Sequence, residues 1–243
     1  MEDFTSENYQ EPQPQLTLSP EEASQVMSRF MTQVYGWMAG ALAVSGAVAM
    51  LVAGSATLQE LVFGNRFVFL GLIIAEIALV GFLSRKAFDW SAGTTTAAFM
   101  GYSALNGLTL GIIFMVYTME SISSTFFITA GTFGLMSLYG YFTRTDLSRW
   151  GNLLFMGLIG LVLASVVNIF LNSPALYWIS SFVGVLLFTA LTAYDTQKVK
   201  MLAFLGYEDD ATDRKAAVLG ALTLYLDFVN LFLFLLRLFG RRR

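Results

Sequence analysis

Residues 216–236, AAVLGALTLYLDFVNLFLFLL, decide the fold, because this run is long and apolar enough to cross a lipid bilayer as one helix. A transmembrane helix needs about 20 predominantly apolar residues, and the run contains a single charged residue, Asp227. Of the 243 residues in the chain, 56% are hydrophobic and 13% are charged, whereas a typical soluble domain has about 25% charged residues. With a mean hydropathy of +0.64, the chain is predicted to be an integral membrane protein.

Six further segments of similar length and character precede this run. Five of the seven segments contain no charged residue, and the other two hold Glu76 and Asp227. The apolar runs are continuous rather than alternating with period two, which favours helices over a β-barrel. The sequence therefore predicts an all-α polytopic membrane protein with seven transmembrane helices, at 34–54, 67–84, 92–117, 122–142, 151–171, 176–194 and 216–236.

The first 33 residues differ from the rest of the chain, because they are acidic, rich in Pro, Gln and Ser, and poor in large apolar groups. Such a segment cannot bury enough apolar surface to fold alone. We expect residues 1–33 to form a disordered tail and residues 34–243 to form one transmembrane domain.

Two pairs of glycines have the spacing that lets membrane helices approach closely. Gly36 and Gly40 lie in the first segment, and Gly107 and Gly111 lie in the third. Both pairs are predicted to be helix-packing positions.

The basic residues indicate the orientation, since cytoplasmic ends of membrane helices are enriched in Lys and Arg. With seven crossings, nine of these residues lie on the N-terminal side and five on the other. This favours a cytoplasmic N-terminus. The C-terminal arginines 241–243 argue against this orientation, because seven crossings place them on the opposite side. If they too are cytoplasmic, one segment does not fully cross the membrane.

The absence of His and Cys from the sequence narrows the chemistry. It excludes acid/base catalysis by His, thiolate nucleophiles, disulfides and metal sites built on His or Cys. The last run has no lysine for a retinal Schiff base, and no glycine-rich phosphate loop occurs. The basic residues are dispersed along the chain, so the sequence does not predict a nucleic-acid-binding surface. We therefore expect that the protein is not an enzyme and binds no cofactor. The lipid bilayer is its expected partner.

Polar residues at helical spacing accompany the two aspartates of the last two segments. Thr192 precedes Asp195 by three residues, while Thr223 and Asn230 lie four before and three after Asp227. Each aspartate therefore lies on a polar stripe that should face the bundle interior. Asp227 is about twelve residues into its run, roughly 18 Å, whereas Asp195 is near a helix end, so spacing does not settle whether they touch.

Two further ionisable residues lie at or near membrane depth, Glu76 within the second segment and Arg85 at its end. A carboxylate at the bilayer centre costs about 2.5–3.5 kcal/mol on insertion scales, so such groups line pathways or have a partner. Arg85 is on the same side as the end of the sixth segment, which allows a contact with Asp195. Alternatively, Arg85 is an ordinary flanking residue, and the aspartates form a structural pair.

Four motifs together resemble the Bax inhibitor-1 family, also called the transmembrane Bax inhibitor motif family, and its bacterial members in particular. They are QVYGWMAGALAVSGAVA at 33–49, AEIALVGFLSR at 75–85, TALTAYDTQKVK at 189–200 and LYLDFVNLFLFLLRLFG at 224–240. The likeness extends over nearly the whole chain after residue 30.

This resemblance implies seven transmembrane helices, with the last one central and wrapped by the other six. It also implies a pH-sensitive calcium leak, which in bacteria is attributed to the plasma membrane. The paired aspartates of the family match Asp195 and Asp227, and its gating arginine latch matches Arg85 by position. Glu76, Thr192, Thr223 and Asn230 are candidate pathway residues.

Resemblance and chemistry together predict a pH-sensitive calcium leak channel or an H⁺-coupled Ca²⁺ carrier. Two carboxylates held close in a low dielectric cannot both ionise easily, so Asp195 and Asp227 would exchange protons as a unit. When ionised they offer the hard oxygen ligands that suit Ca²⁺. The alternatives are a membrane interaction protein that modulates a protease or another membrane complex, and a transporter of another cation.

Overall fold

The computed structural model describes residues 19–204 and 209–243, and within these ranges the chain forms helices and no β-strand. Seven of the helices are long and apolar enough to cross a membrane, which confirms the predicted fold class. The short helix α2 connects the first two of them, and a 3₁₀ turn, η1, precedes the fifth. The elements are α1 Pro20–Gly54, α2 Ala56–Phe63, α3 Arg66–Lys86, α4 Ala92–Val116, α5 Met119–Phe142, η1 Leu147–Trp150, α6 Gly151–Leu171, α7 Pro174–Leu202 and α8 Asp210–Phe239.

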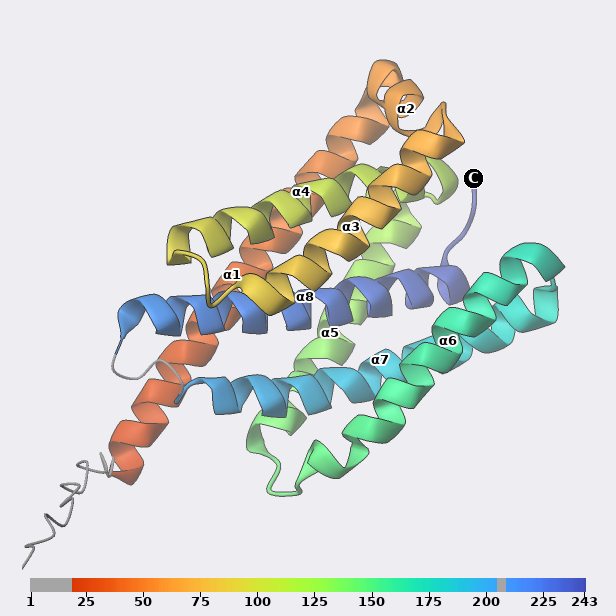
Figure 1. Ribbon diagram of the computed structural model, residues 1–243. Coiled ribbons are helices and arrows are strands. Elements are labelled where there is room, and N and C mark those ends of the chain that lie inside the picture. The colour runs from red at the N-terminus through yellow and green to blue at the C-terminus, as the bar shows by residue number, and fades with distance from the viewer. Residues whose placement is uncertain (1–18, 205–208) are drawn as a thin grey trace, which may run out of the picture.

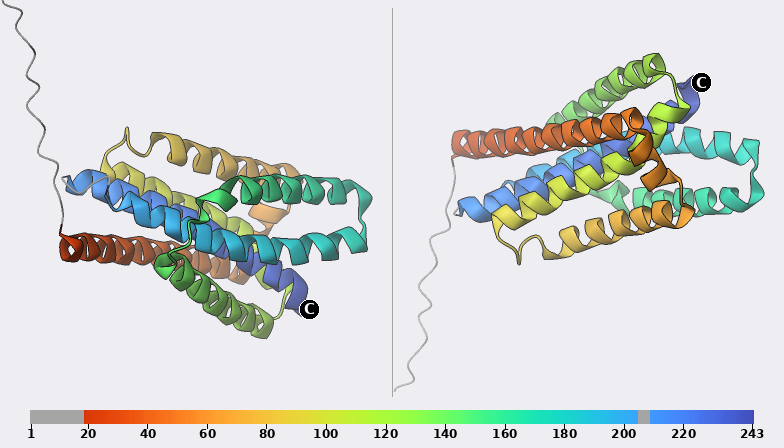
Figure 2. Two further views of the ribbon diagram at one scale, coloured as in Figure 1. Left: turned by 90° about the horizontal axis from the view of Figure 1, so that it is seen from below. Right: turned by 90° about the horizontal axis from the view of Figure 1, so that it is seen from above.

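The long helices form three layers (Figures 1 and 2). Helices α4, α8 and α7 make the middle layer, α1 and α5 cover one side of it, and α3 and α6 lie on the other. Within the most apolar stretch of α8, 72% of the residues are buried, against at most 39% in any other long helix, so the last helix is central as expected. It packs mainly against α1, α4, α5 and α7, while α3 packs on α4 and α6 on α7. Four helices rather than six therefore surround α8.

The sequence of α8 explains its central place, because apolar residues occupy every face of this helix. Leu224, Tyr225 and Leu231 are completely buried. Phe228 packs edge-to-face against Phe133 of α5, with ring centroids 5.5 Å apart. A helix that is apolar all round is stable only when it is surrounded, and its four neighbours provide those contacts.

Helix α1 begins earlier than the sequence analysis predicted. The Ser19 side chain accepts from the Glu22 backbone N–H and the Glu22 carboxylate accepts from the Ser19 N–H, which makes a capping box with Pro20 at the first helical position. Phe30 is buried in the core. The predicted tail 1–33 is therefore wrong for residues 20–33, which are helical, and residues 1–18 lie outside the described residues.

The closest approach of α1 and α4 occurs at Gly107 and Gly111, as their spacing predicted. A Cβ atom at Gly107 would lie 2.7 Å from the backbone oxygen of Ser45 in α1. The other pair behaves differently, because Gly36 has nothing within 4 Å of such an atom and Gly40 has only a side-chain methyl at 4.0 Å. The prediction of close packing is therefore confirmed for α4 and wrong for α1.

We expect Gly107→Ala to lower the free energy of unfolding by about 1–3 kcal/mol, because the added methyl group must push α1 away from α4. Gly36→Ala is the matched control and should leave the free energy of unfolding unchanged or raise it by up to about 1 kcal/mol, since its site is open and Ala favours a helix over Gly. Thermal unfolding in detergent measures both variants. If the two variants were equally stable, α1 and α4 would be able to move apart at Gly107 without loss of stability.

The C-terminal residues lie at the end of the bundle opposite the start of α1 (Figure 1). There they pair with the connection between α4 and α5. The Thr118 N–H donates to the Arg241 carbonyl at 3.1 Å, and the Arg243 N–H donates to the Val116 carbonyl at 2.9 Å. The C-terminus therefore lies at the opposite end of the bundle from the start of α1, as an odd number of crossings requires.

Candidate functional site

Asp195 on α7 and Asp227 on α8 are neighbours across the contact between these two helices. Helices α7 and α8 pack directly against each other in the middle layer. Two ionised carboxylates cannot hydrogen-bond, because neither has a proton to donate. Two neighbouring carboxylates in a low dielectric also repel each other, and a proton or a cation at the pair relieves that repulsion.

Asp227 is the more deeply buried member of the pair, with 4% of its surface exposed. Its Oδ2 atom accepts no hydrogen bond from any N–H or O–H group of the described residues. A buried polar atom without a partner costs about 1–3 kcal/mol, and more if it is charged. Asp195 is the acidic neighbour of this carboxyl group, but it is not hydrogen-bonded to the Oδ2 atom. Asp195 itself is half-buried, and its nearest cationic neighbour is Lys198.

The offset between α7 and α8 brings the two aspartates to the same depth. Gly220 packs against Val199, where a Cβ atom on the glycine would lie 2.7 Å from the valine Cγ1. Gly220 is ten residues into α8, whereas Val199 is three residues from the end of α7. Helix α8 therefore extends roughly 10 Å beyond α7 at this end, and Asp227 lies deep in α8 while still reaching Asp195.

The three polar residues predicted to flank the aspartates are bound within their own helices. Each side chain donates to the backbone oxygen four residues earlier, at 2.7 Å from Thr192, 3.1 Å from Thr223 and 2.8 Å from Asn230. These bonds use their protons and leave oxygen lone pairs free. The residues remain candidate ligands on the polar stripes.

A hydroxyl cluster that the sequence analysis missed lies beside the pair. Ser137 of α5 and Thr196 of α7 are hydrogen-bonded at 3.1 Å, and Tyr35 of α1 lies beside both. Thr196 follows Asp195 directly in the chain and is fully buried. The residues come from three segments, so no local pattern could have identified the cluster.

The hydroxyl cluster lies at one side of a cavity of about 650 Å³ between α1 and α5. Ser24, Ser28 and Thr32 continue the hydroxyl lining along α1 from Tyr35 toward the N-terminal end of the bundle. The cavity therefore extends from that end of the bundle to the side chains that contact Thr196, one residue from Asp195.

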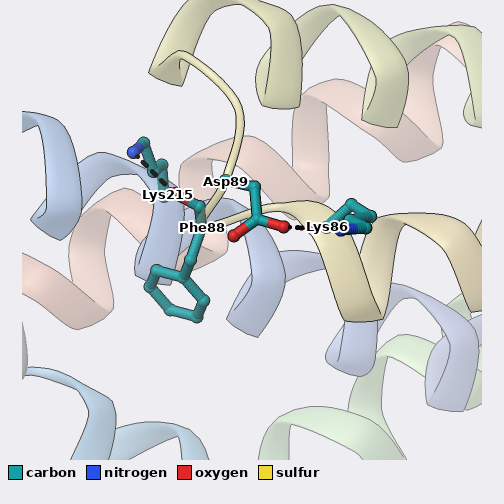
Figure 3. Close-up of polar contacts among 4 residues, drawn as sticks. All are labelled: Lys86, Phe88, Asp89 and Lys215. Atoms are coloured by element: carbon teal, nitrogen blue, oxygen red, sulfur yellow. Dashed lines mark hydrogen bonds and ion pairs between the residues drawn. The ribbon is translucent and has the colours of Figure 1, made fainter.

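Arg85 is not brought to the aspartates. It is exposed at the end of α3, in the outer layer. In the described part of the chain the single ion pair is Lys86 with Asp89, at 2.9 Å, and the turn that follows is tied to α8 by Lys215, which donates to the Phe88 carbonyl at 3.1 Å (Figure 3). The structure thus contains no latch between Arg85 and Asp195.

Glu76 is also separate from the aspartate pair. Its carboxylate accepts from Thr109 at 2.7 Å and from Asn106 at 3.3 Å, both on α4. Since α3 packs on α4 at the edge of the bundle, Glu76 belongs to a different polar group from Asp195 and Asp227.

Comparison with known proteins agrees with the resemblance found in the sequence. The family model described as "Inhibitor of apoptosis-promoting Bax1" matches residues 27–243. "Inner membrane protein YbhL" of Escherichia coli K12 is 56% identical over 218 residues, which cover 89% of this chain and 93% of that protein. An "Uncharacterized protein" of Borreliella burgdorferi is 43% identical over 218 residues, 90% of this chain and 94% of the relative. The chain, with seven membrane-spanning helices of which α8 is the central one, therefore belongs to the Bax inhibitor-1 family.

Proposed function

We propose that this protein lets Ca²⁺ cross the membrane in a pH-dependent manner, as a leak channel or an H⁺-coupled carrier, with Asp195 and Asp227 as the ion and proton site. The observation that supports this most is the buried carboxyl pair, in which Asp227 Oδ2 has no N–H or O–H donor among the described residues. Intramembrane acids commonly belong to ion pathways or proton relays.

The pair supplies the pH dependence of the proposed activity. One proton shared by two carboxyl groups removes their mutual repulsion, and its loss leaves two charges that attract a cation. The chain contains no histidine, which is the usual side chain for sensing pH near neutrality. Proton release and cation binding at Asp195 and Asp227 are therefore alternatives at one site.

The number of ligands favours transient binding of Ca²⁺. Two carboxylates supply at most about four oxygens, whereas Ca²⁺ takes about six to eight. The described residues contain no cluster of three or more acidic, His or Cys side chains that could hold a metal. A Ca²⁺ ion at Asp195 and Asp227 would keep part of its water shell and leave readily, as conduction requires.

The cavity between α1 and α5 supports a route for the ion. Its lining includes the hydroxyl groups of Tyr35 and Ser137, and Ser137 is hydrogen-bonded to Thr196, the residue next to Asp195. Hydroxyl oxygens can replace part of a water shell at low cost. We propose that Ca²⁺ and protons reach the pair from this side.

The orientation and location follow from the charge distribution and from the relatives. One relative is named an inner membrane protein, and we propose the inner membrane of the cell for this chain as well. The N-terminal side has nine Lys and Arg residues against five on the other, so we place it in the cytoplasm. The cavity between α1 and α5 would then open toward the cytoplasm.

Calcium flux into liposomes that contain only this purified protein tests the proposal. Flux should depend on the protein and on pH, and an excess of an organic cation should not compete. Accumulation of Ca²⁺ against its gradient, driven by an imposed pH difference, would identify a carrier rather than a channel. No flux at any pH would contradict the proposal and favour an interaction protein that modulates a protease or another membrane complex.

Arg85→Ala should leave calcium flux unchanged within about twofold, because Arg85 is exposed and makes no ion pair in the described structure. Lys86→Ala is the neighbouring control, since it removes the ion pair with Asp89 at the same helix end. A several-fold rise in basal leak for Arg85→Ala alone would contradict this expectation and restore the latch role in a second conformation.

A further inference from the structure

A second acidic group lies on the opposite face of α8 from the aspartate pair. Glu76 of α3 accepts hydrogen bonds from Thr109 and Asn106 of α4. The Tyr225 hydroxyl of α8 donates to Asn106 Oδ1 at 2.9 Å, and Ser45 Oγ of α1 lies 2.6 Å from the Tyr225 hydroxyl. This chain of side chains, here called the Glu76 network, links four helices.

The depth of Glu76 makes its charge costly. It is ten residues from each end of α3, which places it about 15 Å from either end and hence near the bilayer centre. A bare carboxylate there costs about 2.5–3.5 kcal/mol on insertion scales. Hydrogen-bond donors lower this cost but do not neutralise the charge.

No positive group faces Glu76 in the part of the chain that the structure describes. The titratable groups near it are Tyr102 of α4 and Tyr225 of α8. On α2, which also packs against α3, Glu60 is exposed near the start of α3. The only ion pair within 19–204 and 209–243 joins Lys86 and Asp89. The network therefore holds a carboxyl group without a counter-ion.

A proton fits this site better than a metal ion does. The network contains one carboxyl group, and each of its oxygens already accepts one hydrogen bond. The described residues offer no set of three or more side chains for a metal. A single proton neutralises Glu76 without further ligands.

The Glu76 network is distinct from the aspartate pair. Tyr225 and Asp227 are two residues apart on α8, so they point about 200° away from each other. Glu76, which the sequence analysis named as a candidate pathway residue, therefore does not lie beside Asp195. We propose that Glu76 is a second proton-binding site of this protein, located at the bilayer centre and linked to the central helix through Asn106 and Tyr225.

Infrared spectroscopy of the full-length protein in liposomes, with Ca²⁺ chelated, tests this proposal directly. Protonated carboxyl groups give a carbonyl stretching band that ionised ones lack. Exposed glutamates are ionised above about pH 6, since their ordinary pKa is about 4.3. We expect Glu76→Gln to remove one protonated-carboxyl band between about pH 6 and pH 9, while Glu60→Gln, the exposed control, removes none.

A second variant separates a proton site from a structural one. Tyr225→Phe keeps the ring that packs edge-on against Phe99 and Tyr102 but removes the hydroxyl bound to Asn106. It should change the pH at which the Glu76 band disappears. Asp227→Asn should leave that band in place, because the two groups are on opposite faces.

The result is independent of calcium transport, since no Ca²⁺ is present. If Glu76→Gln, shown to be folded by its thermal unfolding, has the same protonated-carboxyl bands as the unmodified protein across this pH range, Glu76 binds no proton and the proposal fails. It also fails if Asp227→Asn removes the same band, because Glu76 and the pair would then share one proton.

Discussion

Asp227→Asn is expected to reduce calcium flux by about tenfold or more and to flatten its dependence on pH. Asparagine keeps the size of the side chain but cannot ionise, so the pair loses one of its two charged ligands and its shared proton. Calcium sites lose affinity as carboxylates are removed, and a factor of ten corresponds to only about 1.4 kcal/mol. The measurement is Ca²⁺ uptake into liposomes at several pH values between about pH 6 and pH 8.

The matched control is Asp210→Asn, the same substitution in the exposed first turn of the same helix. It should leave both flux and pH dependence unchanged. Loss of flux in Asp227→Asn counts only if the variant unfolds at a temperature close to that of the unmodified protein. Unchanged flux across this pH range would exclude Asp227 from the ion site.

The number and positions of the long helices could be predicted from the sequence, because a span requires a long apolar run and such runs are hard to mistake. The start of α1 could not be predicted from hydropathy, since residues 20–33 are polar on much of their surface. The capping signal SPEE at 19–22 was present in the sequence and would have placed it correctly.

The contact between Asp195 and Asp227 could not be derived from spacing. Counting from the helix ends places the two residues at different depths in the membrane. They reach a similar depth because α8 extends beyond the end of α7, as the contact between Gly220 and Val199 shows. Such an offset depends on how two helices pack, and no single segment encodes it. The family resemblance, which rests on sequence motifs, is what proposed Asp195 and Asp227 as a pair.

The layer that each helix occupies explains the sites that the sequence analysis placed wrongly. Glu76 and Arg85 both lie on α3, which is as apolar as the inner helices but is in the outer layer. Hydropathy therefore did not distinguish them from pathway residues. Tyr35 and Ser137 were missed because nothing in their own segments distinguishes them from other hydroxyl residues. They come together with Thr196 where α1, α5 and α7 meet.

The second large effect concerns how Asp195 and Asp227 act together. If one proton is shared, either Asp195→Asn or Asp227→Asn should abolish the same pH transition in calcium flux, because the remaining carboxyl group has no charged partner. The double variant should then lose little more than either single variant, since residues that act as a unit are strongly non-additive. The measurement is the pH dependence of flux in all four proteins of this cycle.

A second cycle on the same helix shows whether the non-additivity is specific. Asp213 and Asp227 are 14 residues apart on α8, about 21 Å along the helix, so Asp213→Asn and Asp227→Asn should act additively. Additive effects in the Asp195–Asp227 cycle as well, or two pH transitions that vanish one at a time, would show that the aspartates are separate sites. Non-additivity in the first cycle alone is the outcome that a shared proton requires, because Asp195 is the acidic neighbour of Asp227 among the described residues.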